Sequence, residues 1–225
     1  MPNYRICDLN VDIVTNSSTV SRNIERYRTD YEAEPNISLF ITDDRLLELM
    51  EENEGMTADT VETMYLSTLF CWDMFDFNGF PIRAAAVEYD GKAVLFASPF
   101  DESVDLMTAL PEKLVFDYDY PMVRIENDKY FVHDTPFGLH GDLSKHPKKL
   151  ELSSIVFVDT KEFSTLKRLE SKDFVRMFMR AVALNIRHER TKHTLFVLEK
   201  LMHKTQFFGV ADVSDIEFIL EHVAE

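Results

Sequence analysis

The sequence predicts an α/β fold in which a mixed β-sheet is flanked by helices, with a group of helices at the C-terminal end. Two strand-like runs, 82–88 and 92–97, flank Asp90-Gly91, a dipeptide suited to a tight hairpin turn because glycine tolerates positive φ. The polar stretch 98–105 follows and leads into a helix-like pattern at Leu106, which is the strand, loop, helix order of a phosphate loop. Helical spacing of apolar residues recurs at 171–187, 191–204 and 214–223.

The remaining elements follow from periodicity and from residues that interrupt it. Near the N-terminus we expect a strand at 4–14, a helix at 17–27 that Ser17-Ser18-Thr19 caps, a strand at 37–41 and a helix from Asp43. After a break at 51–55, a long amphipathic helix spans 57–75 and ends at the turn Asn78-Gly79. Further strands are predicted at 114–116, 122–125, 130–133 and 155–158. We therefore expect a small N-terminal α/β unit, residues 1–55, packed on a main domain, residues 56–225.

Composition and charge restrict the class of protein. A chain of 225 residues with 45% apolar content can bury one sizeable core. Its 40 acidic and 24 basic residues give a formal charge of −16, which disfavours nucleic acid and anionic membranes as partners and suits a basic partner. The alternative is that the acidity only maintains solubility.

The two cysteines, Cys7 and Cys71, have no metal-site or redox-pair spacing, and we expect both to be reduced and buried. We find no signal sequence and no apolar run of membrane-spanning length. These observations predict a cytoplasmic protein.

A family resemblance rests on four segments in the same order. Residues 83–87 and 90–96 resemble the strands before the phosphate loop of HPr kinase-related proteins, and 98–110 aligns without a gap with that family's Gly-Pro-Ser-Gly-Thr-Gly-Lys-Ser-Thr loop and its Leu-Thr-Ala-Leu helix. Residues 116–124 are similar to its acidic pair followed by Pro and Arg, and 130–137 to its Tyr-x-x-x-Gly-Thr-Pro-Trp segment. The resemblance implies an HPr-kinase-like P-loop fold.

The phosphate loop itself departs from the family pattern at almost every position. A phosphate loop needs glycines for its backbone geometry and a lysine that reaches the β- and γ-phosphates. The replacements are Ser98, Asp101 and Ser103 for glycines, Val104 for the lysine and Asp105 for the magnesium-binding hydroxyl, with Glu102 adding another charge and Pro99 retained. We therefore expect ATP and magnesium binding to be lost, with the loop acids capping the following helix themselves. The alternative is a plain surface turn with a helix N-cap, in a protein unrelated to this family.

A few residues outside the loop are candidate remnants of the family's site. Arg83 stands where the family often has His, and it either faces a ligand or lies on a solvated surface. Asp119 matches the second acid of the family's pair, and it is either a remnant metal ligand or a turn residue. His140 belongs to a glycine-containing loop that helps to position substrate in active relatives. If any metal is bound, Asp105 and Asp119 are the expected ligands. His133, His140 and His146 lack zinc-site spacing, so we expect solvated loop histidines.

These features predict a pseudokinase, a catalytically degenerate HPr-kinase-like protein that binds a protein or peptide as an accessory or regulatory factor. The resemblance suggests modified-peptide biosynthesis as its setting. The alternatives are an atypical metal-dependent enzyme that uses an acidic rearranged site and a purely structural subunit. An apolar stripe, formed by Phe174, Met177, Phe178, Ala181, Val182 and Leu184, indicates either core or a homo-oligomer interface. No Ser-His-Asp set with a recognisable nucleophile motif is present.

Overall fold

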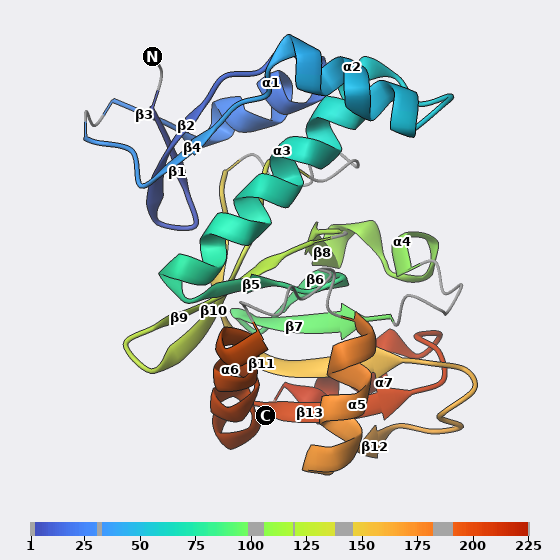
Figure 1. Cartoon of the computed structure of the whole chain (residues 1–225). Coiled ribbons are helices and arrows are strands. Elements are labelled where there is room, and N and C mark those ends of the chain that lie inside the picture. The colour runs from blue at the N-terminus through green and yellow to red at the C-terminus, as the bar shows by residue number, and fades with distance from the viewer. Residues whose placement is uncertain are drawn as a thin grey trace.

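The computed structural model has a mixed α/β fold that contains two sheets (Figure 1). The structure describes residues 3–30, 33–98, 106–118, 120–137, 146–181 and 191–224. The N-terminal elements form one layer, the long helix α3 crosses beneath them, and the larger sheet with the C-terminal helices lies on the other side of α3 (Figure 1). Within the described residues, no helix combines the length and the apolar character needed to cross a membrane.

The N-terminal sheet has four strands in the order β3-β1-β2-β4. Its strands are β1 (Asn3–Ile6), β2 (Leu9–Ile13), β3 (Arg28–Thr29) and β4 (Ile37–Leu39). The expectation of one strand at 4–14 is wrong, because Cys7 and Asp8 adopt positive φ values of 50° and 60° and turn the chain into a β1–β2 hairpin. Neither residue is a glycine, so the sequence gives little warning of this turn.

Three capped helices follow the expected pattern. They are α1 (Ser18–Ile24), which continues as a 3-10 turn at Glu25–Tyr27, α2 (Asp43–Glu52) and α3 (Ala58–Met74), which continues at Phe75–Phe77. The side chains of Ser17, Thr42 and Thr57 accept hydrogen bonds from the first turns of α1, α2 and α3 respectively. Leu66, Phe70 and Met74 of α3 are fully buried in the core of the N-terminal sheet.

The larger sheet has nine strands, seven of which follow the order β5-β9-β10-β11-β7-β6-β8, while β13 pairs with β11 and β12. Its strands are β5 (Gly79–Pro81), β6 (Ala84–Tyr89), β7 (Lys92–Ala97), β8 (Val115–Asp117), β9 (Met122–Glu126), β10 (Lys129–His133), β11 (Lys149–Val158), β12 (Lys167–Arg168) and β13 (Gln206–Val210). Strands β7, β11 and β13 are parallel to one another, and the other pairs are antiparallel. The β6–β7 hairpin is confirmed, with φ values of 49° at Asp90 and 72° at Gly91.

Helices cover both faces of this sheet. Alternate residues of β6 and β7 contribute to two separate cores, so that Ala86 and Leu95 face one core while Val87 and Phe96 face the other. The first core is completed by α5 (Ser171–Ala181) and α6 (Thr191–Lys204), and the second by α7 (Ile216–Val223). The short α4 (Leu106–Ala109) and the 3-10 turn Glu112–Leu114 lie between β7 and β8 in the chain.

The stripe of Phe and Met residues on α5 lies inside the chain. Phe174, Met177 and Phe178 are at most 1% exposed, and the ring of Phe174 stacks on Phe207 of β13 at a centroid distance of 3.6 Å. The interpretation of this stripe as core is confirmed for its described residues, whereas Val182 and Leu184 lie outside them. Both cysteines are buried free thiols, as expected. Burial raises the pKa of the Cys71 thiol to about 12, so this thiol stays protonated at neutral pH.

Candidate functional site

The expected phosphate loop lies between a strand and a helix of the larger sheet. β7 ends at Ala97, the buried Ser98 follows directly, and α4 begins at Leu106. This edge is where the parallel strands β7, β11 and β13 have their carboxyl ends, which is where open α/β sheets bind ligands. Six further predicted loop positions lie outside the described residues: Pro99, Asp101, Glu102, Ser103, Val104 and Asp105.

Strand register brings Arg83 to the same edge as Ser98. Ala84 of β6 pairs with Ala97 of β7, so the residue before β6 and the residue after β7 lie together at one end of the hairpin. The backbone N–H of Arg83 donates to the carbonyl of Ala181, the last residue of α5, at 3.1 Å. Asp119 and His140, the other predicted remnants, lie outside the described residues.

A buried aspartate that the sequence analysis missed lies at this edge. Phe157 of β11 pairs with Ala97 of β7, so Asp159, directly after β11, lies beside the start of the loop. Phosphate-loop enzymes hold magnesium with an aspartate of this kind. The signal was available in the sequence, because four apolar residues, 155–158, precede this acid.

In this chain the carboxylate of Asp159 is already satisfied by neighbouring groups. Its side chain is fully buried, and its Oδ2 accepts a hydrogen bond from Nη1 of Arg180 in α5 at 2.9 Å. Its Oδ1 accepts from the backbone N–H groups of Lys161 at 2.9 Å and Glu162 at 3.1 Å. Arg180 therefore neutralises the charge of Asp159, the carboxylate that directly follows β11.

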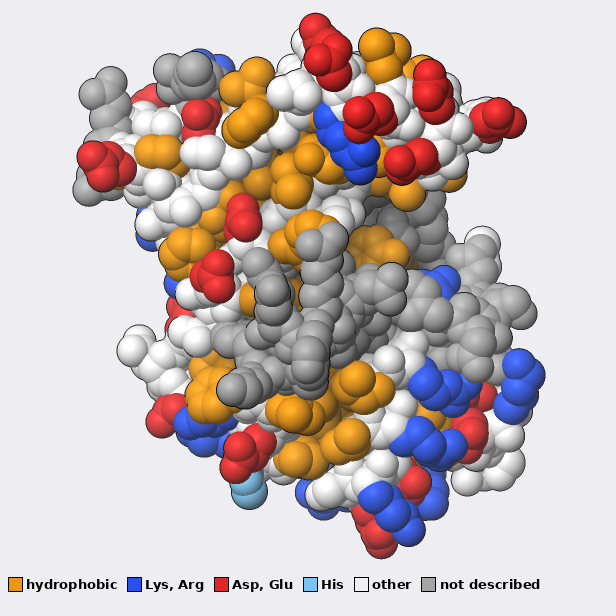
Figure 2. All heavy atoms as spheres, in the orientation of Figure 1, with side chains coloured by type: hydrophobic (Ala, Val, Ile, Leu, Met, Phe, Trp, Pro, Cys, Tyr) orange, Lys and Arg blue, Asp and Glu red, His pale blue; other side chains and the backbone are white. Residues whose placement is uncertain are grey.

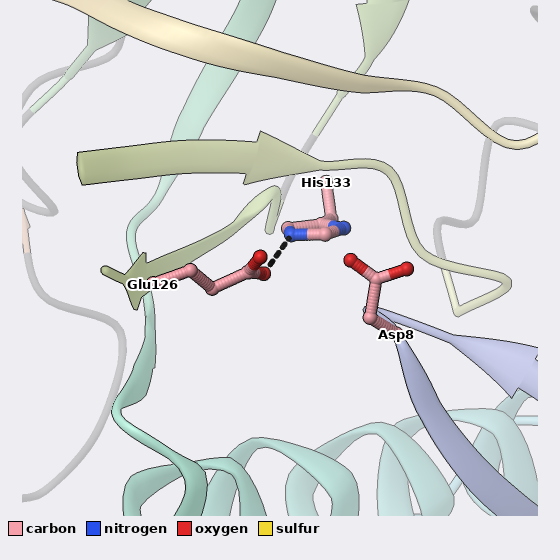
Figure 3. A group of neighbouring side chains, drawn as sticks. All are labelled: Asp8, Glu126 and His133. Atoms are coloured by element: carbon pink, nitrogen blue, oxygen red, sulfur yellow. Dashed lines mark hydrogen bonds and ion pairs between the residues drawn. The ribbon is translucent and has the colours of Figure 1, made fainter. Parts of the chain in front are cut away.

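A second charged group lies where the N-terminal hairpin meets the larger sheet (Figure 3). We call Asp8, Glu126, His133 and Lys149 the junction cluster. Asp8 lies in the β1–β2 turn, Glu126 ends β9, His133 ends β10 and Lys149 begins β11. The ammonium group of Lys149 donates to Oδ2 of Asp8 and to Oε2 of Glu126, both at 2.5 Å, while Nε2 of His133 lies 3.3 Å from Oε1 of Glu126.

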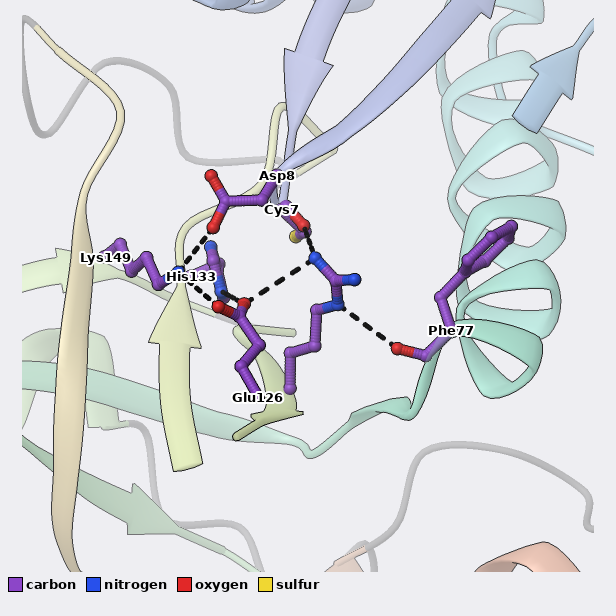
Figure 4. Close-up of polar contacts among 7 residues, drawn as sticks. Cys7, Asp8, Phe77, Glu126, His133 and Lys149 are labelled. Atoms are coloured by element: carbon purple, nitrogen blue, oxygen red, sulfur yellow. Dashed lines mark hydrogen bonds and ion pairs between the residues drawn. The ribbon is translucent and has the colours of Figure 1, made fainter. Parts of the chain in front are cut away.

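The guanidinium group of Arg124 extends this network across the junction (Figure 4). It donates to the backbone carbonyls of Cys7 at 2.6 Å and of Phe77 at 3.1 Å. It also lies 3.6 Å from a carboxylate oxygen of Glu126. One arginine of β9 thus binds the N-terminal hairpin turn and the end of α3 to the larger sheet.

The junction cluster corrects the expectation that His133 is a solvated loop residue. This side chain is only 4% exposed and lies on a strand, with Asp8 reaching it from the N-terminal hairpin. Burial lowers the pKa of His133 to about 4, although the carboxylates of Asp8 and Glu126 act in the opposite direction. The imidazole is therefore neutral at pH 7.

Lys149 is the cation of the junction cluster. Burial by itself lowers the pKa of Lys149, but the hydrogen bonds to Asp8 and Glu126 outweigh this effect and raise it. The same lysine overcomes the effect of burial on Asp8 and lowers the pKa of that carboxyl. The carboxylate of Asp8 and the ammonium of Lys149 therefore stay charged at neutral pH.

Three members of the junction cluster have the chemistry of metal ligands. One oxygen each of Asp8 and Glu126 and one ring nitrogen of His133 all lie within 4.8 Å of one another. Carboxylate and neutral imidazole are common ligands of zinc and manganese. The ammonium of Lys149 lies against both carboxylates, so a divalent cation would have to displace it. The arrangement as it stands is an ion-paired structural contact.

Comparison with known proteins assigns no family to this chain. Neither a family model nor a curated protein matches the sequence. The function is therefore argued from the described residues and from the sequence of the loop.

Proposed function

We propose that this chain is a catalytically inactive HPr-kinase-like protein that binds a protein or peptide as an accessory or regulatory factor. The observation that carries this proposal is the ion pair between Asp159 and Arg180. In an active enzyme, a carboxylate at the end of this strand would serve magnesium. Here an arginine of the same chain takes that place.

The sequence of the loop supports the same conclusion. Residues 98–105 contain neither glycine nor lysine, so the chain lacks the residue types that form a phosphate cradle and contact the β- and γ-phosphates. The loop instead holds Asp101, Glu102 and Asp105. At ~6 Å and an effective dielectric constant of ~20, each carboxylate would oppose each unit of phosphate charge by roughly 2–3 kcal/mol before salt screening.

The proposed partner is a basic protein or peptide. A formal charge of −16 attracts such a partner and repels nucleic acid and anionic membranes. A cytoplasmic location and modified-peptide biosynthesis are further parts of the proposal, the first supported by the two unpaired buried thiols and the second by the family resemblance. Assembly into a homo-oligomer stays a prediction.

A metal-dependent enzyme is the second candidate function, and one observation favours it. The junction cluster places two carboxylates and an imidazole within reach of one ion. The acids that the sequence suggested for such an enzyme, Asp101, Glu102, Asp105 and Asp119, lie outside the described residues. The position of Lys149 makes this candidate the weaker one.

A thermal-shift panel with ATP, GTP, magnesium and manganese separates the two functions. A ligand at 100 times its dissociation constant stabilises the folded state by about 2.7 kcal/mol, which raises the melting temperature of a chain of this size by about 5–10 °C. We expect no such shift for any nucleotide or metal. We expect none for Val104→Lys either, because that variant still lacks the glycines. A saturable shift with nucleotide in the unmodified chain would overturn the proposal, and one with metal alone would favour the enzyme.

A further inference from the structure

An apolar groove lies between α2 and α3. Figure 1 shows these two helices next to each other at the top of the view. Its volume is about 260 Å³, and its apolar lining comes from Leu49 of α2 and from one face of α3, namely Val61, Met64, Tyr65, Leu69 and Trp72. None of these residues takes part in the junction cluster or in the edge of the sheet at Ser98. The groove therefore has no role in the sites described so far.

The helix α2 leaves its apolar residues incompletely covered. Four of its ten residues are Leu or Met, yet none of the ten, all of which the structure describes, is buried. Met64, which lines the groove on the facing helix, is 43% exposed, while Leu47 of α2 is 61% exposed on a face of the helix that does not line the groove. A surface helix normally buries its apolar stripe against a neighbour. The α2–α3 surface is thus a helix pair with room for a third element.

The rim of the groove is acidic on the α2 side, because Glu48 and Glu52 pair with Arg45, which lines the groove. Residues 43–54 contain six acids, Asp43, Asp44, Glu48, Glu51, Glu52 and Glu54, and one basic residue, Arg45. Figure 2 shows acidic side chains gathered over α2, with hydrophobic side chains exposed between α2 and α3. A second copy of this chain would bring one acidic rim against another, which disfavours self-association at this surface.

The acids at the end of α2 also lie where a helix favours cations. The last turn of α2 contains no basic residue, and Glu51 and Glu52 stand beside the partial negative charge of the C-terminal end. A cationic partner would relieve this unfavourable interaction, because its charge would lie between the two glutamates and the exposed end of the helix. Charge and apolar surface thus favour the same type of ligand.

We propose that the groove between α2 and α3 binds a basic amphipathic helical peptide, with apolar side chains on Met64 and Tyr65 and lysine or arginine side chains on the acidic rim. This inference rests on the proposed function, since it names the surface and the chemistry of the peptide that the inactive protein binds. An amphipathic helix that fits an apolar groove presents residues at positions i, i+3, i+4 and i+7.

Arg45 gives the proposal its sharpest consequence. This residue lines the groove, donates to Glu48 at 2.8 Å and lies 3.9 Å from Glu52, so it competes with a cationic ligand for both carboxylates. Arg45→Gln frees these acids and should strengthen the binding of a basic peptide by about two- to five-fold. Glu48→Gln should weaken it by a similar factor. A groove for an acidic ligand would show both effects reversed.

The experiment measures the fluorescence anisotropy of a labelled helical peptide with leucine at the four anchor positions and lysine elsewhere, titrated with the full chain. We expect saturable binding that weakens as salt rises, and about a ten-fold loss of affinity in Met64→Ser. Met179→Ser on α5 is the matched control, since Met179 is 47% exposed but lies away from the groove, and Glu217→Gln on α7 controls for the loss of charge. Both controls should leave the affinity unchanged.

Three binding results would overturn the groove proposal. They are the absence of saturable binding, equal affinity for an acidic version of the same peptide, and binding that Met64→Ser leaves unchanged. Concentration-dependent dimerisation of the chain that Met64→Ser abolishes would also overturn it, because a second copy would then be the occupant. The outcome is separate from that of the nucleotide panel. Nucleotide binding would contradict the proposed inactivity but would leave the groove proposal intact. Peptide binding at another surface would contradict the groove proposal alone.

Discussion

Replacing Arg180 by methionine tests the ion pair that the proposed function depends on. The carboxylate of Asp159 is fully buried, and Arg180, 26% exposed, is its charged partner at 2.9 Å. Removing one partner of a buried pair costs about 3–5 kcal/mol, because the other charge stays buried. Asp159 keeps two backbone hydrogen bonds, from Lys161 and Glu162, so we expect Arg180→Met to cost about 2–3 kcal/mol of unfolding free energy.

Urea unfolding, followed by the fluorescence of the single tryptophan, measures this loss. The matched control is Arg176→Met, one turn earlier on α5, where the arginine is 47% exposed and pairs with Glu162 at 2.7 Å. An exposed pair of this kind contributes at most about 1 kcal/mol. The double variant Arg180→Met, Asp159→Asn should recover most of the loss, since no buried charge is left. Equal losses in the two single arginine variants would refute the reasoning.

Three further predictions concern stability. Asp59 accepts hydrogen bonds from residues 17–19 at the start of α1, and the hydroxyl of Thr19 is the largest cause of its lowered pKa. Asp59→Asn should lower the free energy of unfolding by about 1–2 kcal/mol at pH 7. The difference from the parent should shrink as acid protonates Asp59, and urea midpoints measured across pH would confirm or contradict this trend. His133 has a folded-state pKa of about 4 against 6.5 in an unfolded chain, so the free energy of unfolding should fall by up to about 3 kcal/mol as pH drops from 6.5 to 4. A His133→Gln variant whose unfolding free energy has the same slope against pH would contradict this assignment. Gly209→Ala would place a methyl group 2.3 Å from Cζ of Phe163, so urea denaturation should show a loss of about 1–3 kcal/mol of unfolding free energy. An unchanged midpoint would show that the ring moves freely and would contradict this prediction.

Local signals allowed much of the fold to be predicted from sequence. Asp90-Gly91 marked the β6–β7 hairpin, and Thr57 with the apolar spacing after it marked α3, because turn and cap preferences depend on neighbouring residues alone. The β1–β2 turn was missed because neither Cys7 nor Asp8 is a glycine, although aspartate is depleted in strands and tolerates positive φ. Strand β13, Gln206–Val210, was also missed, since a short apolar run next to a helix lacks a clear period.

The candidate site was harder to predict, because its contacts join distant parts of the chain. His133 is buried by a hairpin turn that lies more than a hundred residues earlier in the sequence, and no spacing rule connects it with Asp8. Asp159 could have been noticed after four apolar residues, but its pairing with Arg180 depends on how α5 packs on the sheet. Ser98 directly follows β7 and Arg83 directly precedes β6, and their membership of a remnant phosphate site stays a prediction.

Calorimetric titration of the full chain with Mg²⁺-ATP tests the central claim most directly. The account predicts heats no larger than those of dilution at every nucleotide concentration, since the loop lacks its cradle and Asp159 is held by Arg180. A saturable isotherm with micromolar affinity would contradict it, and would show that the acidic residues of the loop accommodate a nucleotide after all.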